Sequence, residues 1–397
     1  MLSIGFTLAG ALAVQSVGIS LWQHVAATRF RFQRGEPELS SGFAFPSITV
    51  LKPLKGCDAE TRKNLESWFT QDYPGELQIL FGVASAKDPA FATVQNLLGK
   101  YPHRKAELLI CPPCDACNPK VSTLIQLSKH ARGNLIVISD ADVRAPRPLL
   151  RHLIATLSQP GVGLAHCLYQ MANPTGLAMR MEAMGVNGDF WAQVTQARSL
   201  GMIDFALGAV MALRREVLEE IGGFQRIADY LADDYKLGNL VSSTGRRIEL
   251  CRIVVDCFSP SESSSEVWRH QLRWTRTVRI CKPGPFLLSI LGNATLWPLC
   301  FLAASVFSSV GCAAFAVWLS IRILLLQSRA RRLSGDSSRP TDAWLAPAHD
   351  LLQVALWAVA QFGNRVTWHG KTYGVLEGGK MVPIESSEQG MQQTPAR

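Results

Sequence analysis

The clearest fold signal in the chain is Leu135-Ile136-Val137-Ile138-Ser139-Asp140-Ala141-Asp142-Val143. It begins with consecutive apolar residues led by Leu, Ile and Val, which is typical of a strand buried on both faces of a parallel sheet. Two carboxylates follow, one residue apart, where that strand would end. Open α/β sheets bind ligands at the carboxyl ends of their strands, and two hard oxygen ligands there suit Mg²⁺ or Mn²⁺ held against substrate phosphates. Asp-x-Asp after a strand is also ordinary turn chemistry, so this stretch alone leaves both interpretations open.

Strands and helices alternate on both sides of this stretch. The predicted strands cover residues 47–54, 78–84, 106–111, 162–168 and 207–213, and the predicted helices cover 59–71, 89–100, 119–131, 146–157, 175–196 and 232–243. Such alternation predicts a three-layer α/β domain with a mostly parallel sheet.

Two apolar regions predict a membrane protein. Residues 2–27 carry no charge and are long enough to cross a bilayer, and three arginines, Arg29, Arg31 and Arg34, follow directly. Positive charge marks the cytoplasmic side, so we expect the N-terminus outside and the α/β domain in the cytoplasm. Residues 286–326 are long enough for two further spans, and the basic cluster at 329–332 indicates a return to the cytoplasm.

The basic segment before these spans predicts an interfacial helix. Its arginines recur every three or four residues on one helical side, and we assign two of them, Arg276 and Arg279, to the membrane surface. Residues 344–362 are a weaker candidate for a membrane span, because His349 and Asp350 would be costly to bury in the bilayer. A re-entrant or surface-lying helix is therefore favoured there over a further span.

The expected organisation has eight parts. They are a transmembrane anchor (1–28), a linker (29–46), a cytoplasmic α/β domain (47–264), an amphipathic interfacial helix (265–284), two transmembrane helices (285–327), a basic cytoplasmic linker (328–343), a re-entrant or interfacial segment (344–376) and a disordered tail (377–397).

The net charge of +9 has two common explanations. Basic residues beside apolar runs fit a membrane facing anionic lipid, and no aromatic platform or recognition helix suggests a nucleic-acid partner. The ten cysteines include Cys111-Pro-Pro-Cys114-Asp-Ala-Cys117, which lacks the second ligand pair of a zinc site. Reduced thiols are the expected state.

Short motifs link the chain to a known family. In order they are Leu51-Lys52-Pro53-Leu54-Lys55-Gly56, Gln71-Asp72-Tyr73-Pro74, Lys87-Asp88-Pro89-Ala90, Asn118-Pro119-Lys120, Ser139-Asp140-Ala141-Asp142, Gly222-Gly223-Phe224, Asp233-Asp234-Tyr235 and Arg273-Trp274. Each is weak alone. Together, between an N-terminal anchor and C-terminal spans, they resemble the ceramide glucosyltransferase family of inverting GT-A glycosyltransferases, which includes bacterial hopanoid-biosynthesis glycosyltransferases.

The resemblance implies roles for the acidic residues, because the family pattern is D, D, D, (Q/R)xxRW. Asp88 would bind the nucleoside of a UDP-sugar. Asp142, helped by Asp140, would hold Mg²⁺ or Mn²⁺ against the pyrophosphate. Asp234 would be the general base that takes a proton from the acceptor hydroxyl, and Asp233 would be a capping or supporting residue.

The last family motif departs from its pattern in this chain, where His270 stands in place of the first Gln or Arg. Either His270 or Gln271 would supply the contact of that position. By the same resemblance Arg273 would contact the departing diphosphate, for which guanidinium geometry is well matched. Trp274 would line the acceptor groove.

The implied activity is transfer of a hexose, with inversion, from a UDP-sugar to a membrane lipid. UDP-glucose as donor and ceramide as acceptor is the favoured combination, and UDP-N-acetylglucosamine with a hopanoid polyol (bacteriohopanetetrol) is the alternative. A non-catalytic membrane nucleotide-binding module would keep the Asp140/Asp142 pair but could dispense with Asp234 and the Arg-Trp motif, both of which are present. We expect an integral, multi-pass membrane protein located in the bacterial inner membrane, with its catalytic domain in the cytoplasm.

Overall fold

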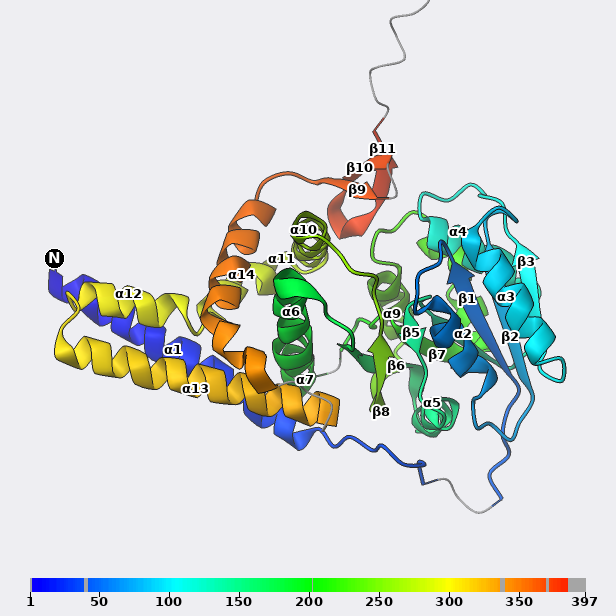
Figure 1. Cartoon of the computed structure of the whole chain (residues 1–397), viewed down its shortest axis with the longest axis horizontal. Coiled ribbons are helices and arrows are strands. Elements are labelled where there is room, and N and C mark those ends of the chain that lie inside the picture. The colour runs from blue at the N-terminus through cyan, green and yellow to red at the C-terminus, as the bar shows by residue number, and fades with distance from the viewer. Residues whose placement is uncertain (1, 39–41, 202, 336–339, 369–370, 385–397) are drawn as a thin grey trace, which may run out of the picture.

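The computed structural model describes residues 2–38, 42–201, 203–335, 340–368 and 371–384. Long helices project from one side of an α/β domain, and a small C-terminal sheet lies at the top of the view in Figure 1. This arrangement confirms the predicted fold class of a mostly parallel α/β domain with apolar helices on either side of it in sequence.

The described part of the chain forms one large sheet of eight strands, in the order β3-β2-β1-β4-β7-β6-β8-β5. Neighbours among β3, β2, β1 and β4 are parallel, as are β6 and β8, whereas β7 is antiparallel to both of its neighbours and β5 to β8. The strands are β1 (Ile48–Leu54), β2 (Leu77–Val83), β3 (Lys105–Ile110), β4 (Leu135–Ser139), β5 (Val143–Arg144), β6 (Val162–Met171), β7 (Val210–Arg214) and β8 (Arg247–Cys257).

Helices cover both faces of this sheet and create two apolar cores. Strand β4 shows why: Ile136 and Ile138 lie in one core, while Leu135 and Val137 lie in the other, and all are buried. Successive strand residues point to opposite faces, so a continuous apolar run needs cover on both. One face is covered by α2 (Thr61–Phe69), α3 (Pro89–Lys100) and α5 (Leu149–Leu157), and the other by α4 (Pro119–Ser128), α7 (Trp191–Ser199), α8 (Arg215–Glu220) and α9 (Asp233–Ser243).

The predicted helix over 175–196 is interrupted. It consists of α6 (Gly176–Met184), a π-helical turn η1 (Gly185–Phe190) and then α7. Asn187 in this turn hydrogen-bonds both backbone groups of Met171 at the end of β6, at 2.9 and 3.0 Å. A π-turn inserts one extra residue per turn, which rotates the side chains that follow.

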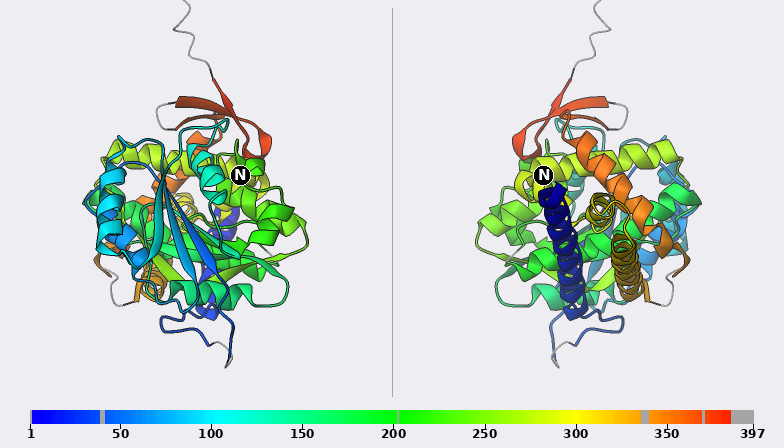
Figure 2. Two further views of the ribbon diagram at one scale, coloured as in Figure 1. Left: turned by 90° about the vertical axis from the view of Figure 1, so that its right-hand side faces the viewer. Right: turned by 90° about the vertical axis from the view of Figure 1, so that its left-hand side faces the viewer.

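Two described helices are long and apolar enough to cross a membrane, α1 (Leu2–Arg29) and α13 (Ser309–Ser334). The first predicted C-terminal span is instead a bent pair, in which α11 (Pro283–Ser289) with a short 3₁₀ turn meets α12 (Leu296–Ala304) at 49°. In the right-hand view of Figure 2, α1 and α13 lie beside one another and point away from the sheet. The second span also runs to Ser334, past the predicted end at 327.

A buried charged cluster joins these helices to the α/β domain. Arg322 of α13 pairs with Asp189 of η1 at 2.7 Å and with Asp350 of α14 (Ala346–Ala360) at 2.7 Å. Arg329 also reaches Asp189, at 2.9 Å, and bonds the hydroxyl of Ser20 in α1 at 3.1 Å. Two guanidinium groups and two carboxylates balance in charge, which is the condition for burying them. The charge at Asp350 is thus neutralised inside the protein.

The C-terminal part of the described chain contains structure that was not expected. Strands β9 (Arg365–Trp368), β10 (Lys371–Val375) and β11 (Met381–Pro383) form a separate antiparallel sheet (Figure 2, left), so the expected disordered tail does not begin at 377. Residues 385–397 lie outside the described chain. On the interfacial segment, observed as α10 (Ser264–Cys281), Arg276 and Arg279 donate hydrogen bonds to backbone carbonyls of residues 362–365. These bonds hold the connection between α14 and β9, and the predicted contact of the two arginines with the membrane surface stays a prediction.

Candidate active site

The two carboxylates of the Asp-x-Asp motif lie where β4 ends, next to β7 and β8. The Asp140 backbone N–H donates to the Ala209 carbonyl at 3.2 Å, and Phe258 N–H donates to the Asp142 carbonyl at 3.0 Å. Both side chains are half-buried. The backbone of neighbouring strands therefore holds the motif at the carboxyl end of β4, as the sequence predicts.

Lys120 connects this motif to the start of α9. Its ammonium group lies 2.7 Å from Asp140 Oδ1 and 3.0 Å from Asp233 Oδ2. The position of Lys120 follows from Asn118, whose side chain caps α4 by accepting from Lys120 N–H at 3.0 Å and donates to the Tyr230 carbonyl at 2.9 Å. A cap residue that also binds a distant loop fixes the first turn of the helix.

A second lysine lies beneath the same strand end. Lys52 of β1 is fully buried, donates to Ser139 Oγ at 3.2 Å and to the Asp140 carbonyl, and lies over the Trp68 ring at 5.0 Å. Burial lowers the pKa of Lys52 to about 8, although the carboxylates of Asp142 and Asp140 oppose that shift. The positive charge of Lys52 in turn stabilises the ionised form of Asp142.

The acidic side chains are electrostatically linked. Burial, with the negative charge of Asp140, raises the pKa of Asp142 to about 6, while Lys52 and Lys120 oppose the rise. Burial, with Asp233, raises the pKa of Asp234 to about 6, and Lys120 again opposes it. Lys120 thus favours the ionised form of both Asp142 and Asp234, and Lys52 favours that of Asp142.

The two aspartates that open α9 have different environments. Asp233 is buried and paired with Lys120, whereas Asp234 is half-buried and accepts from the Tyr235 backbone N–H at 2.7 Å. Asp234 also faces Gly208, where an added Cβ would lie only 2.9 Å from its Oδ2. Glycine at 208 therefore leaves room for the Asp234 carboxylate, and the supporting role of Asp233 stays a prediction.

Asp88 lies at another strand end, after β2. It caps α3 by accepting from Ala90 N–H at 2.9 Å, and it accepts from Gly56 N–H at 3.0 Å. Gly56 has φ +75°, a conformation that glycine adopts at little cost. The Asp88 carboxylate therefore orders the loop after β1, and its predicted contact with a nucleoside stays a prediction.

Helix α10 carries the remaining predicted residues. His270 Nδ1 lies 3.0 Å from Glu182 Oε1 on α6, and its ring lies 4.3 Å from that of Trp274. Gln271 is buried and accepts from Gln353 of α14 at 3.0 Å. The two candidates for the Gln or Arg position thus differ in structure, because His270 faces α6 and Gln271 faces α14.

Arg273 is half-buried on the same helix. Burial lowers the pKa of its guanidinium group, and the nearby Glu262 carboxylate opposes that shift. Tyr235 Oη donates to the Cys281 carbonyl at 3.1 Å, so α9 is tied to the end of α10. Arg273 lies eight residues before Cys281, about 12 Å along the helix at 1.5 Å per residue.

The structure therefore brings some predicted residues together and separates others. Asp140, Asp142 and Asp234 share one electrostatic cluster. The other predicted residues lie elsewhere: Asp88 contacts the loop after β1, and α10 carries His270, Gln271 and Trp274. Lys52 and Lys120 lie within the sequence motifs, but no role was predicted for either of them, and Glu182 was not predicted at all. A lysine within an apolar strand was the available signal for Lys52.

The strand-end carboxylates fit a divalent cation. Their oxygens are the hard ligands that such cations prefer. The positive charge of a cation would also lower the raised pKa of Asp142 and offset the repulsion between Asp140 and Asp142. Two other groups in the described residues, Glu182–Glu262–His270 and Asp189–His349–Asp350, bring ligand atoms within 4.8 Å of one another. The second is already neutralised by Arg322 and Arg329.

Comparisons with known proteins identify the family of the chain. The model of glycosyl transferase family 21 matches residues 8–381. Ceramide glucosyltransferase 3 of Caenorhabditis elegans is 23% identical over 377 residues, covering 91% of this chain and 79% of the relative. Ceramide glucosyltransferase 1 of the same organism is 25% identical over 273 residues, covering 66% of this chain but 55% of that relative, so this match spans about half the relative's length. Beta-monoglucosyldiacylglycerol synthase of Synechocystis is 24% identical over 234 residues, covering 57% of this chain and 46% of that relative.

A solved structure supports the fold independently. The mannosyltransferase of Pyrobaculum calidifontis, in complex with GDP-Man and Mn²⁺, has a TM-score of 0.53 and 19% identity, covering 90% of this chain and 99% of that one. At this identity the likeness concerns the fold alone. Because the family model matches nearly the whole chain, from the first apolar helix to the C-terminal sheet, the protein belongs to glycosyl transferase family 21.

Proposed function

We propose that the protein is a multi-pass membrane glycosyltransferase that transfers a hexose from a UDP-sugar to a hydroxyl of a membrane lipid, with inversion. UDP-glucose and ceramide are the first donor and acceptor, and the α/β domain faces the cytoplasm, where UDP-sugars are made available. The observation that carries this proposal is the site at the end of β4, where Asp142 and Asp234 have pKa values of about 6 while Lys120 pairs with Asp140 and Asp233.

Asp234 is the proposed general base. Its carboxylate takes the proton of the lipid hydroxyl as that oxygen forms a bond to the anomeric carbon. The bond between the anomeric carbon and the diphosphate oxygen breaks, and UDP leaves with that electron pair. A base with a pKa of about 6 is mostly ionised at pH 7 yet accepts a proton better than an ordinary aspartate.

The other polar residues bind and orient the donor in this proposal. Asp142 and Asp140 would hold Mg²⁺ or Mn²⁺, which neutralises charge on the departing diphosphate. Arg273 would donate to the diphosphate, for which a planar guanidinium is well suited, and Trp274 would line the acceptor groove. Asp88 would approach the nucleoside through the loop that it orders at Gly56.

The acceptor is a lipid because apolar helices flank the domain and join it through the buried Arg322 cluster. The names of the relatives indicate ceramide and diacylglycerol as acceptors in those proteins. A hopanoid polyol, with UDP-N-acetylglucosamine as donor, is the second pairing for this chain. All three acceptors offer a hydroxyl near the bilayer surface, and the Tyr235 bond to the Cys281 carbonyl ties the start of α9, with Asp234, to the end of α10, next to the apolar C-terminal helices.

Membranes containing the protein should be incubated with labelled UDP-glucose or UDP-N-acetylglucosamine and each of the three acceptors, and the lipid product identified by mass spectrometry. Asp234→Asn serves as the matched inactive control, because it keeps the side-chain shape and removes the proton acceptor. Transfer that depends on Asp234 supports the proposal, and the most active pairing names the substrates. Folded protein that binds UDP but transfers neither sugar to any acceptor would favour the non-catalytic nucleotide-binding module instead.

A further inference from the structure

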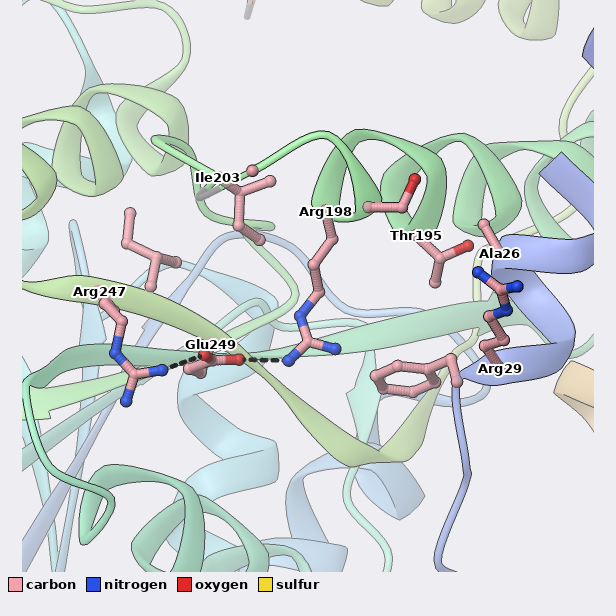
Figure 3. Close-up of a pocket in the computed structure, with 11 residues that line it drawn as sticks. Ala26, Arg29, Thr195, Arg198, Ile203, Arg247 and Glu249 are labelled. Carbon is pink, nitrogen blue, oxygen red and sulfur yellow. Dashed lines mark hydrogen bonds and ion pairs between the residues drawn. The ribbon is translucent and has the colours of Figure 1, made fainter. Parts of the chain in front are cut away.

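A pocket of about 420 Å³ lies between the end of α1, the end of α7 and the start of β8 (Figure 3). Strand β8 runs in the same direction as β4, because β8 is parallel to β6 and each of the two antiparallel steps through β7 reverses the direction. Arg247 at its start and Asp256 near its end are therefore separated by about 30 Å at 3.3 Å per residue. The pocket thus lies at the amino-terminal end of β8, and the Asp-x-Asp motif lies near the opposite end of that strand.

The pocket is basic. Glu249 binds two arginines, with its Oε2 2.8 Å from Arg198 and its Oε1 2.9 Å from Arg247, as the dashed lines in Figure 3 show. Arg29, in the last turn of α1, is exposed and also lines the pocket. Three guanidinium groups and one carboxylate leave a formal charge of +2 in a concave site. A phosphate group matches the planar donor set of guanidinium groups.

The pocket also has an apolar side. Its inner wall includes buried Phe30, Ile203 and Ile248. On α1, Trp22 precedes Ala26 by four residues and Val25 precedes Arg29 by four, so these exposed apolar side chains continue the same helical face towards the bilayer. A tryptophan near the end of a spanning helix is typical of the membrane–water boundary. Arg29 follows Trp22 by seven residues, about 10 Å along the helix, so it lies just on the domain side of that boundary, and the apolar track leads from it towards the bilayer.

We propose that this pocket binds the phosphate of an anionic phospholipid whose acyl chains follow the Trp22–Val25 face of α1. Basic pockets beside membrane helices are the expected sites for such headgroups. A bound lipid would connect α1 to α7 and β8, and so would hold the α/β domain against the bilayer. The proposal rests on the membrane helices and the pocket, and it is independent of the sugar-transfer chemistry.

The test uses the full chain in nanodiscs of phosphatidylcholine with increasing phosphatidylglycerol, and native mass spectrometry measures the retained phosphatidylglycerol. The double variant Arg29→Gln/Arg198→Gln removes two of the three arginines. Each arginine near an anionic surface contributes on the order of fivefold in affinity, so the loss of two should weaken retention roughly twenty-fivefold. The matched control, Arg31→Gln/Arg252→Gln, removes two exposed arginines that do not line the pocket and should leave retention close to the wild-type value.

Two further measurements keep the test decisive. Glu249→Gln raises the charge of the pocket by one and should strengthen phosphatidylglycerol retention, a gain that misfolding cannot produce. In uncharged detergent, inorganic phosphate and glycerol 3-phosphate should stabilise the protein far less than phosphatidylglycerol, because they lack the acyl chains. Equal stabilisation by the soluble phosphates, equal losses in the control and pocket variants, or unchanged retention after Arg29→Gln/Arg198→Gln would overturn the proposal.

Discussion

Replacing Lys120 with methionine should destabilise the fold and shift the pH dependence of activity together. The substitution keeps most of the side-chain volume but removes the cation between Asp140 and Asp233. The loss of one partner of a buried ion pair costs about 3–5 kcal/mol, whereas an exposed pair is worth at most about 1 kcal/mol. The Lys120 and Asp233 side chains are 20% and 10% exposed, but Asp140 is 38% exposed, so the Asp233 contact dominates. We therefore expect a loss of roughly 3 kcal/mol in the free energy of unfolding.

The same change should raise the pKa of Asp142 and Asp234 further, because Lys120 lowers both. Activity should then need a higher pH than in the wild type. Denaturant unfolding in detergent measures the first effect, and the pH profile of sugar transfer measures the second. Lys129→Met, at the exposed end of the same helix, is the control and should change neither. A Lys120→Met protein with wild-type stability and an unshifted pH profile would refute the bridging role of Lys120.

Four other outcomes are expected. Asp234→Asn should lower kcat at least a hundredfold, on the scale typical of general bases, with little change in UDP-sugar affinity, while Asp233→Asn should mainly lower stability; a reversed pattern in kcat would place the base at Asp233. Activity should fall as the pH drops through about 6, where Asp234 takes up its proton, and this group should not destabilise the fold there, because its raised pKa favours the protonated form in the folded state; acid loss of activity that tracks unfolding would contradict this. Gly208→Ala should reduce kcat by crowding Asp234, without a large change in melting temperature, and wild-type kcat would show that the carboxylate has room to move. EDTA should inhibit transfer reversibly, with recovery on adding Mg²⁺ or Mn²⁺, and full activity in chelator would remove Asp140 and Asp142 from a metal role.

Much of the fold could be predicted from local sequence pattern. The apolar run before Asp140 predicted a strand buried on both faces. Helix α3 has the expected bounds, and it begins at Pro89 because that proline follows a capping aspartate. Strand β8 was missed, although it pairs with β6 along most of its length. Its sequence mixes Arg247, Glu249, Arg252 and Asp256 with apolar residues, and β6 shifts register against it twice, so no regular alternation marks it. Strand preference depends on neighbours that a linear pattern does not contain.

The sequence alone determined where the acidic motifs stand relative to the strands, the alternation of strands and helices, and the apolar runs that form α1 and most of α13. These are local properties, set by side-chain periodicity and by the chemistry of single motifs. Tertiary structure determined the pairing of Lys120 with Asp140 and Asp233, the neutralisation of Asp350 by Arg322, and the sharing of Glu249 by Arg198 and Arg247. Each joins residues from distant elements. Burial makes an unpaired charge so costly that the folded chain brings such groups together, and a sequence lists charges without stating which of them will be buried side by side.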